Sequence, residues 1–81
     1  MSFEAFQRVV LARDIPEEGL QKGDIGVVVE HYAAREGTRA GYELEFFGAT
    51  GQTIAVVSVP ADAVREARGD EVLTVRERAR A

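Results

Sequence analysis

Residues 19–30, Gly-Leu-Gln-Lys-Gly-Asp-Ile-Gly-Val-Val-Val-Glu, constrain the fold of this chain more than any other segment. Its glycines allow a tight turn at residues 22–24, because glycine adopts the positive φ that such turns require. The turn leads directly into β-branched residues, which favour an extended strand. Gly26 lies inside this strand and predicts a place where two backbones pass closely. The segment therefore predicts a turn followed by the second strand of a small barrel.

Other short apolar runs, separated by turn residues, predict an all-β domain. The expected strands cover residues 8–12, 25–32, 42–47 and 53–59, with a short fifth strand at 64–66. Pro16 and Gly19 predict a turn in the long first loop. Pro60 ends the fourth strand because it lacks the amide donor of a central ladder, and residues 60–64 suit a single 3-10 turn.

Residues 70–78 are ambiguous. We favour a strand that closes or pairs the sheet, or partial disorder beyond Arg76. The alternative is a short helix with Asp70 as its cap.

Together these elements predict a small five-stranded SH3-like barrel with a short 3-10 turn before the last strand and a C-terminal extension. We expect a single SH3-like domain over residues 1–81, with a core at about 6–68 and a tail at 69–81. The second and fourth strands are apolar on two faces, which indicates that both are covered or that one face is a contact surface. The side chains expected to point inward are Val9, Leu11, Leu20, Ile25, Val27, Val29, Leu44, Phe46, Ile54, Val56 and Val64.

Several motifs resemble a known family. They are, in chain order, Arg8-Val9-Val10-Leu11, Asp14-Ile15-Pro16-Glu17-Glu18-Gly19-Leu20, Lys22-Gly23-Asp24-Ile25-Gly26-Val27-Val28-Val29-Glu30, Tyr42-Glu43-Leu44-Glu45-Phe46 and Gly51-Gln52-Thr53-Ile54-Ala55-Val56-Val57. From about Phe6 to Val75 the chain is similar to the bacterial family called domain of unknown function 4926. The resemblance implies a small stand-alone SH3-like protein without an established activity, and it supplies no functional residues. It also implies a partner protein encoded nearby, in settings suggestive of toxin–antitoxin pairs.

Composition excludes several kinds of site. The chain has no cysteine, which excludes disulfides, thiolate metal sites and a cysteine nucleophile. Its formal net charge is −4 and the excess acid lies in residues 1–62, so nucleic-acid binding through the barrel is disfavoured. The N-terminal residues lack a signal-peptide pattern and residues 48–61 are too short to span a bilayer. We therefore expect a cytoplasmic protein without a membrane partner.

No pattern of residues predicts catalysis. His31 is the only histidine and lacks a recognisable nucleophile partner. The carboxylates Glu30, Glu43 and Glu45 fit the solvated face of a barrel better than a metal site or an acid–base pair. The glycines open a strand, whereas a phosphate-binding loop opens a helix. We expect no enzymatic activity, no metal and no cofactor.

Aromatic and acidic residues on neighbouring strands predict the functional surface. The alternation at residues 42–47 puts Tyr42, Leu44 and Phe46 on one face and Glu43 and Glu45 on the other. Tyr32, Tyr42 and Phe47 fit a peptide-binding groove, although aromatic volume also suits a small core. Glu43 and Glu45 would set the charge of the partner. The leading hypothesis is a non-enzymatic module that binds a basic protein, such as a nucleic-acid-acting toxin that it neutralises, through this face or an exposed strand edge.

A second hypothesis is a KOW-like nucleic-acid-binding or regulatory barrel. The turn and strand at residues 20–28 resemble those of KOW-type domains. Binding would use the C-terminal arginines, and affinity for short RNA and DNA at low salt distinguishes the two hypotheses. These arginines are Arg65, Arg68, Arg76, Arg78 and Arg80. A homodimer through strand edges or the tail is a further expectation.

Overall fold

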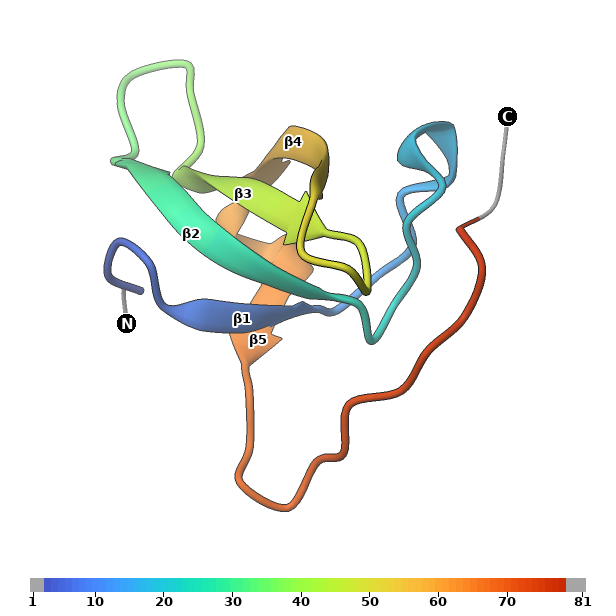
Figure 1. Ribbon diagram of the computed structural model, residues 1–81. Helices are drawn as coiled ribbons and strands as arrows, with labels where there is room; N and C mark the ends of the chain where they lie inside the picture. The colour runs from blue at the N-terminus through green and yellow to red at the C-terminus, as the bar shows by residue number, and fades with distance from the viewer. Residues whose placement is uncertain (1–2, 79–81) are drawn as a thin grey trace.

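The computed structural model describes residues 3–78 and shows an all-β domain with five antiparallel strands in one sheet, as predicted (Figure 1). The strands are β1 (Arg8–Leu11), β2 (Ile25–Tyr32), β3 (Gly41–Phe47), β4 (Thr53–Pro60) and β5 (Val64–Glu66). Two 3-10 turns, η1 (Pro16–Glu18) and η2 (Ala61–Ala63), precede β2 and β5. The strand order is β4-β3-β2-β1-β5, so β5 returns to pair with the first strand and β4 ends the other side of the sheet.

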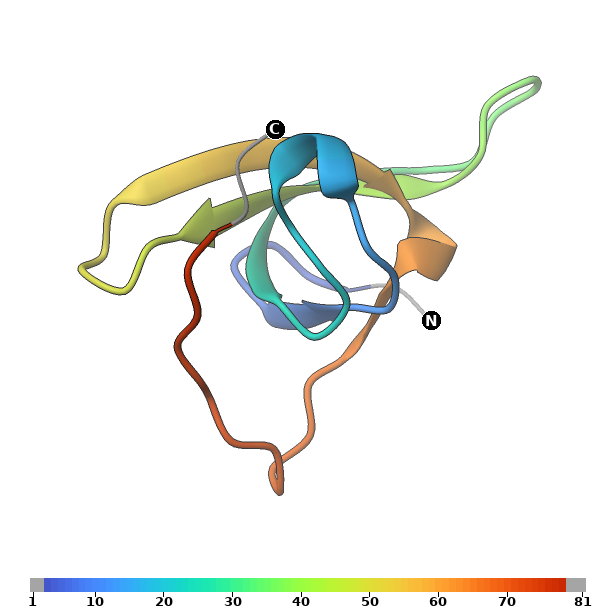
Figure 2. The same cartoon turned by 90° about the vertical axis from the view of Figure 1, so that its right-hand side faces the viewer.

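The sheet curves so that its two ends enclose a common core (Figure 2). Val9 and Leu11 of β1 belong to the same buried cluster as Leu44 and Phe46 of β3. Each such side chain stabilises the fold by about 1.5–3 kcal/mol when it is removed from water. The inward predictions for these four residues, and for Leu20 and Val64, are confirmed.

The glycine-rich turn forms as predicted. Gly19 and Gly23 have positive φ values of 68° and 96°, and Gly19 ends η1, which Pro16 begins. The prediction for Gly26 is wrong in its physical reason. A Cβ at Gly26 would lie 2.9 Å from Cε2 of Phe46, so this glycine makes room for an aromatic ring and not for a second backbone.

The face of β2 that points inward is opposite to the predicted one. Val28 is fully buried, whereas Ile25, Val27 and Val29 are half-buried. Because side chains alternate along a strand, Val28 shares its face with Gly26, over which the Phe46 ring packs. The inward expectation for Ile25, Val27 and Val29 is therefore wrong.

The face of β4 is also inverted. Ile54 and Val56 expose 36% and 54% of their surface, although both were expected to point inward. The register with β3 explains the difference, since Ala55 pairs with Phe46 and Val57 pairs with Leu44. Cross-strand partners point to the same side of a sheet, so the buried residues of β3 select Ala55 and Val57 for the core.

The tail forms neither the strand that we favoured nor the alternative helix. Residues 71–78 have no regular secondary structure and run around the side of the barrel toward η1 (Figures 1 and 2). Val72, Leu73 and Val75 have the strand propensity that suggested pairing, but all three are exposed. Charged side chains fix the course of this segment instead, as described below.

Candidate functional site

Tyr42 is a core residue. It exposes 2% of its surface, and its hydroxyl accepts a hydrogen bond from the backbone N–H of Phe3 at 3.0 Å. Its ring packs against Phe3 and His31, with centroid distances of 5.6 Å and 5.1 Å. The expectation that Tyr42 presents its ring to a partner is therefore wrong, and its position on the same strand face as Leu44 was the signal for burial.

Tyr32 and Glu43 lie together on the outward side of the sheet. The Tyr32 hydroxyl donates to Oε1 of Glu43 at 3.1 Å, and Ser58 of β4 donates to the same oxygen at 3.5 Å. The pKa of Tyr32 is raised, first by this hydrogen bond and then by desolvation and by the negative charges of Glu43 and Glu30. These contacts connect three adjacent strands through one carboxylate.

Glu45 and Phe47 continue the same side of β3. Glu45 pairs with Val56 of β4 and accepts a hydrogen bond from the hydroxyl of Thr53. Phe47 exposes 45% of its surface. We define the outer face as the outward side of β2, β3 and β4, formed by Val27, Glu30, Tyr32, Glu43, Glu45, Phe47, Val56 and Ser58. Tyr32, Glu43, Glu45 and Phe47 thus lie on one surface, and Tyr42 does not.

Sequence reasoning missed Val56 and Ile54 as surface residues. Both were assigned to the core, yet they add exposed apolar area next to Phe47 at the beginning of β4. The available signal was that this strand is apolar on both faces. When only one face of such a strand is buried, the other face remains as an apolar contact surface.

The β4 edge is open over the residues that the structure describes. The carbonyl oxygen of Ile54 points away from β3 and accepts a hydrogen bond from Nη1 of Arg78 at 2.9 Å. Backbone groups of alternate residues point to the same side of a strand, so those of Val56 and Ser58 also face this side. In the strand order no neighbour follows β4 there.

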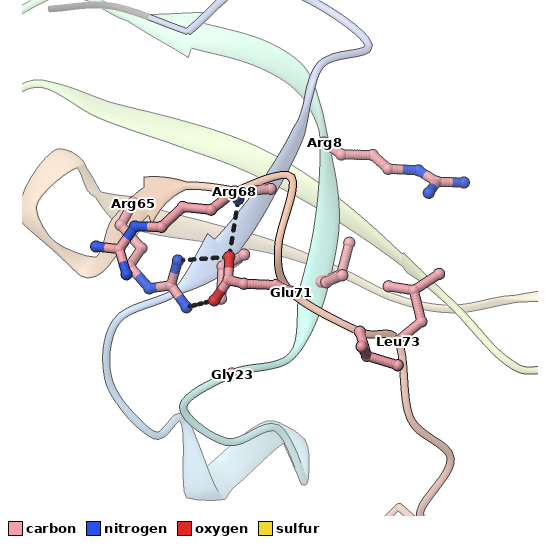
Figure 3. Close-up of a pocket in the computed structure, with 10 residues that line it drawn as sticks. Arg8, Gly23, Arg65, Arg68, Glu71 and Leu73 are labelled. Carbon is pink, nitrogen blue, oxygen red and sulfur yellow. Dashed lines mark hydrogen bonds and ion pairs between the residues drawn. The ribbon is translucent and has the colours of Figure 1, made fainter.

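A cavity of about 250 Å³ separates the tail from the outward side of β1, β2 and β5. Its apolar walls include Val10, which is buried although it lies outside the main core, and Leu73 of the tail. In Figure 3 the guanidinium of Arg65 faces Glu71, with N–O distances of 3.1 Å and 2.6 Å, and Arg8 points away from this pair. The cavity thus combines apolar walls with an internally neutralised ion pair.

Charged contacts hold the tail on the barrel. The ion pairs join Arg65 to Glu71 at 2.6 Å, Arg76 to Asp24, and Arg78 to Glu18 at 3.9 Å. Asp24 belongs to the glycine-rich turn, which therefore also anchors the tail. Three arginines of the nucleic-acid hypothesis are paired in this way, and Arg80 lies outside the described residues.

Acid is expected to release the tail. Hydrogen bonds from Arg65 and from the backbone N–H of Arg68 lower the pKa of Glu71 from 4.5 to about 2. A carboxyl group with a lowered folded-state pKa contributes stability above its unfolded pKa, and this contribution is lost as the pH falls from 4.5 through about 2. NMR shifts of the Val72 and Leu73 amides should follow this titration. In the Glu71→Gln variant these two amides should have the chemical shifts of the released tail already near neutral pH. An unchanged acid transition in this variant would contradict the role of Glu71 in holding the tail.

Comparison with known proteins identifies a family whose model matches this chain. A family model described as Domain of unknown function (DUF4926) matches residues 5–66, which include all five strands and exclude the tail. No curated protein and no solved structure shows significant similarity to the chain. Within residues 3–78, no helix is long and apolar enough to cross a membrane, and no cluster of three potential metal ligands occurs.

Proposed function

Because the chain belongs to the DUF4926 family, whose description assigns no activity, we propose a function from its surface. In this proposal the protein is a non-enzymatic interaction module that binds an extended, basic segment of a partner protein on the outer face and along the β4 edge. The observation that carries this proposal is Val56, an exposed apolar residue that lies opposite Glu45 on an edge strand. The cytoplasmic location stays a prediction.

Strand addition is the binding mode that the β4 edge supports. An extended segment that pairs with an edge strand gains main-chain hydrogen bonds, and the side chains on one face supply specificity. Here the open backbone groups belong to Val56 and Ser58, and Pro60 limits the edge at one end because proline has no N–H to offer. Phe47 and Val56 would contact alternate apolar side chains of the added strand.

The charge of the outer face supports a basic partner. Glu30 and Glu43 are direct cross-strand neighbours, and Glu45 lies on the same side of β3. The residues that define the outer face include no lysine or arginine, so this negative charge is not offset within it. Complementary charge raises association rates and rejects acidic partners. Proteins that act on nucleic acids carry basic surfaces, which fits the role of a neutralising or accessory partner.

A peptide titration tests the proposal. We expect a short peptide of alternating valine and arginine to shift the Val56 and Ser58 amides in NMR spectra, and a valine–glutamate peptide to leave them unchanged. Val56→Lys should weaken binding by about tenfold or more, because it introduces a like charge at the contact. Glu45→Gln keeps the oxygen that accepts from Thr53 and should weaken binding by about threefold.

The matched control is Glu66→Gln, which removes the same charge from an exposed residue of β5 at the other end of the sheet. Its peptide affinity should equal that of the wild type. Equal losses in Glu45→Gln and Glu66→Gln would show a general charge effect and would count against a site on the outer face. Tight binding of short RNA at low salt, without peptide binding, would favour the KOW-like alternative instead.

A further inference from the structure

The described part of the tail, residues 69–78, leaves large apolar side chains exposed beside its own barrel. Val72, Leu73 and Val75 expose 83%, 63% and 85% of their surface. Ion pairs at Glu71 and Arg76 flank these residues, so polar contacts and not apolar burial fix their position. Consecutive exposed apolar side chains are characteristic of an interaction site.

The same segment supplies the extended apolar strand that the β4 edge requires of a partner. Residues 72–75, Val-Leu-Thr-Val, have high strand propensity, and the arginines that follow them are paired with acidic residues of the same molecule. The outer face offers the exposed apolar side chains of Val56 and Phe47 beside the open β4 edge. One chain therefore carries both halves of a complementary contact.

Within one molecule these halves do not meet. Val72 and Leu73 line the cavity beside Val10 of β1, while β4 forms the far end of the sheet from β5. Among the described residues of the tail, Arg78 reaches β4, where it donates to the carbonyl oxygen of Ile54 at 2.9 Å. Residues 72–75 cannot lie along their own β4 while the adjacent Glu71 stays paired with Arg65.

We infer that the chain forms a two-fold dimer in which residues 72–75 of each copy add as a strand to the β4 edge of the other copy. The inference rests on the same open edge as the proposed function. In each copy the contact between Arg78 and Ile54 places the last described residue of the tail at the beginning of the β4 edge. A two-fold axis next to this contact would bring the tail of each copy opposite β4 of the other copy. Two short strand contacts form an interface in the size class of weak, transient complexes, so the dimer is expected to dissociate on dilution.

Cysteine cross-linking tests the inference without background, because the chain contains no native cysteine. We expect an oxidised mixture of full-length Val75→Cys and Val56→Cys proteins to form disulfide-linked heterodimers. The control mixture pairs Val75→Cys with Ala49→Cys, which lies in an exposed turn. Its yield should be lower by about tenfold, because only an organised contact raises the effective thiol concentration. In sedimentation experiments, the wild type should dimerise with rising concentration and Val75→Asp should remain a monomer.

The outcomes separate this inference from the proposed function. Equal cross-linking in both mixtures, or a wild type that is monomeric at about 1 mM, would overturn the dimer. A Val75→Asp variant that dimerises like the wild type would overturn it as well. If the basic peptide still shifts the Val56 amide in these cases, the proposed function stands alone. If cross-links form but the peptide does not bind, the dimer is supported and the proposed binding of a basic partner protein is contradicted.

Discussion

Replacing Leu44 with alanine is expected to lower the free energy of unfolding by about 3–5 kcal/mol, one of the two largest effects that we predict for this chain. Leu44 is completely buried in β3, which pairs with β2 on one side and β4 on the other. Alanine would remove apolar contacts within the buried cluster and leave a cavity that the surrounding strands can only partly fill. A domain of this size has a total stability of roughly 4–12 kcal/mol, so the variant should be close to its folding limit.

Urea unfolding monitored by circular dichroism measures this effect, and Val56→Ala is the matched control. Val56 lies on the adjacent strand but exposes more than half of its surface, so its truncation should change stability by less than about 0.5 kcal/mol. Similar losses in the two variants would mean that Val56 packs in the core and that the assigned face of β4 is incorrect. The comparison therefore tests the fold and the outer face together.

Short apolar runs separated by turn residues predicted the number and positions of the strands well. The bounds of β2 and β5 agree with the expected ranges, and the turn before β2 has glycines at positive φ as expected. These features depend on local chemistry, because a β-branched run and a glycine turn specify backbone conformation without reference to distant residues.

The inward faces of β2 and β4 could not be predicted in the same way. Both strands carry apolar side chains at consecutive positions, so a period of two residues does not distinguish their faces. Distant side chains decide the outcome. The Phe46 ring needs the space at Gly26 and pairs with the small Ala55, which turns Val28 inward and Val56 outward. Aromatic volume on β3 thus determines which residues of its neighbours reach solvent.

The course of the tail depends on contacts over an even larger separation. Arg76 pairs with Asp24 and also donates to the carbonyl oxygen of Gly19, both in the glycine-rich turn. No local pattern reveals such a pair, because arginines and carboxylates are common throughout the chain. Strand propensity at residues 72–75 suggested pairing within the chain, whereas in the inferred dimer these residues pair with β4 of the other copy.

Part of the outer face followed from the alternation of β3. Glu43 and Glu45 occupy alternate positions of one strand, so they were expected on one side, and they lie there together with Phe47. The same alternation placed Tyr42 with Leu44, and the structure buries both. The exposed apolar component on β4 depended on the face of that strand, so sequence alone could not add Val56 to the surface.

Replacing Gly41 with alanine is expected to destabilise the fold by about 2–3 kcal/mol or more, because the added methyl group meets a backbone that cannot move independently. A Cβ at Gly41 would lie 2.6 Å from the carbonyl oxygen of Val59, on the neighbouring strand β4. Gly41 pairs with Pro60 in the ladder, so relief of the clash requires β3 and β4 to separate at this end. Gly26→Ala should cost less, since the atoms it would meet belong to the Phe46 side chain.

Thermal unfolding of Gly41→Ala beside Gly69→Ala measures this effect. A methyl group at Gly69 would meet no heavy atom within 4 Å, so this replacement should be neutral or stabilising by up to about 1 kcal/mol through the unfolded chain. Equal stabilities of the two variants would contradict the close approach of β3 and β4. Because the outer face spans these strands, separation at Gly41 should also weaken binding of the valine–arginine peptide, even under conditions where the variant remains folded. Retained affinity together with the stability loss would restrict the binding site to the opposite end of β4, near Ile54 and Val56.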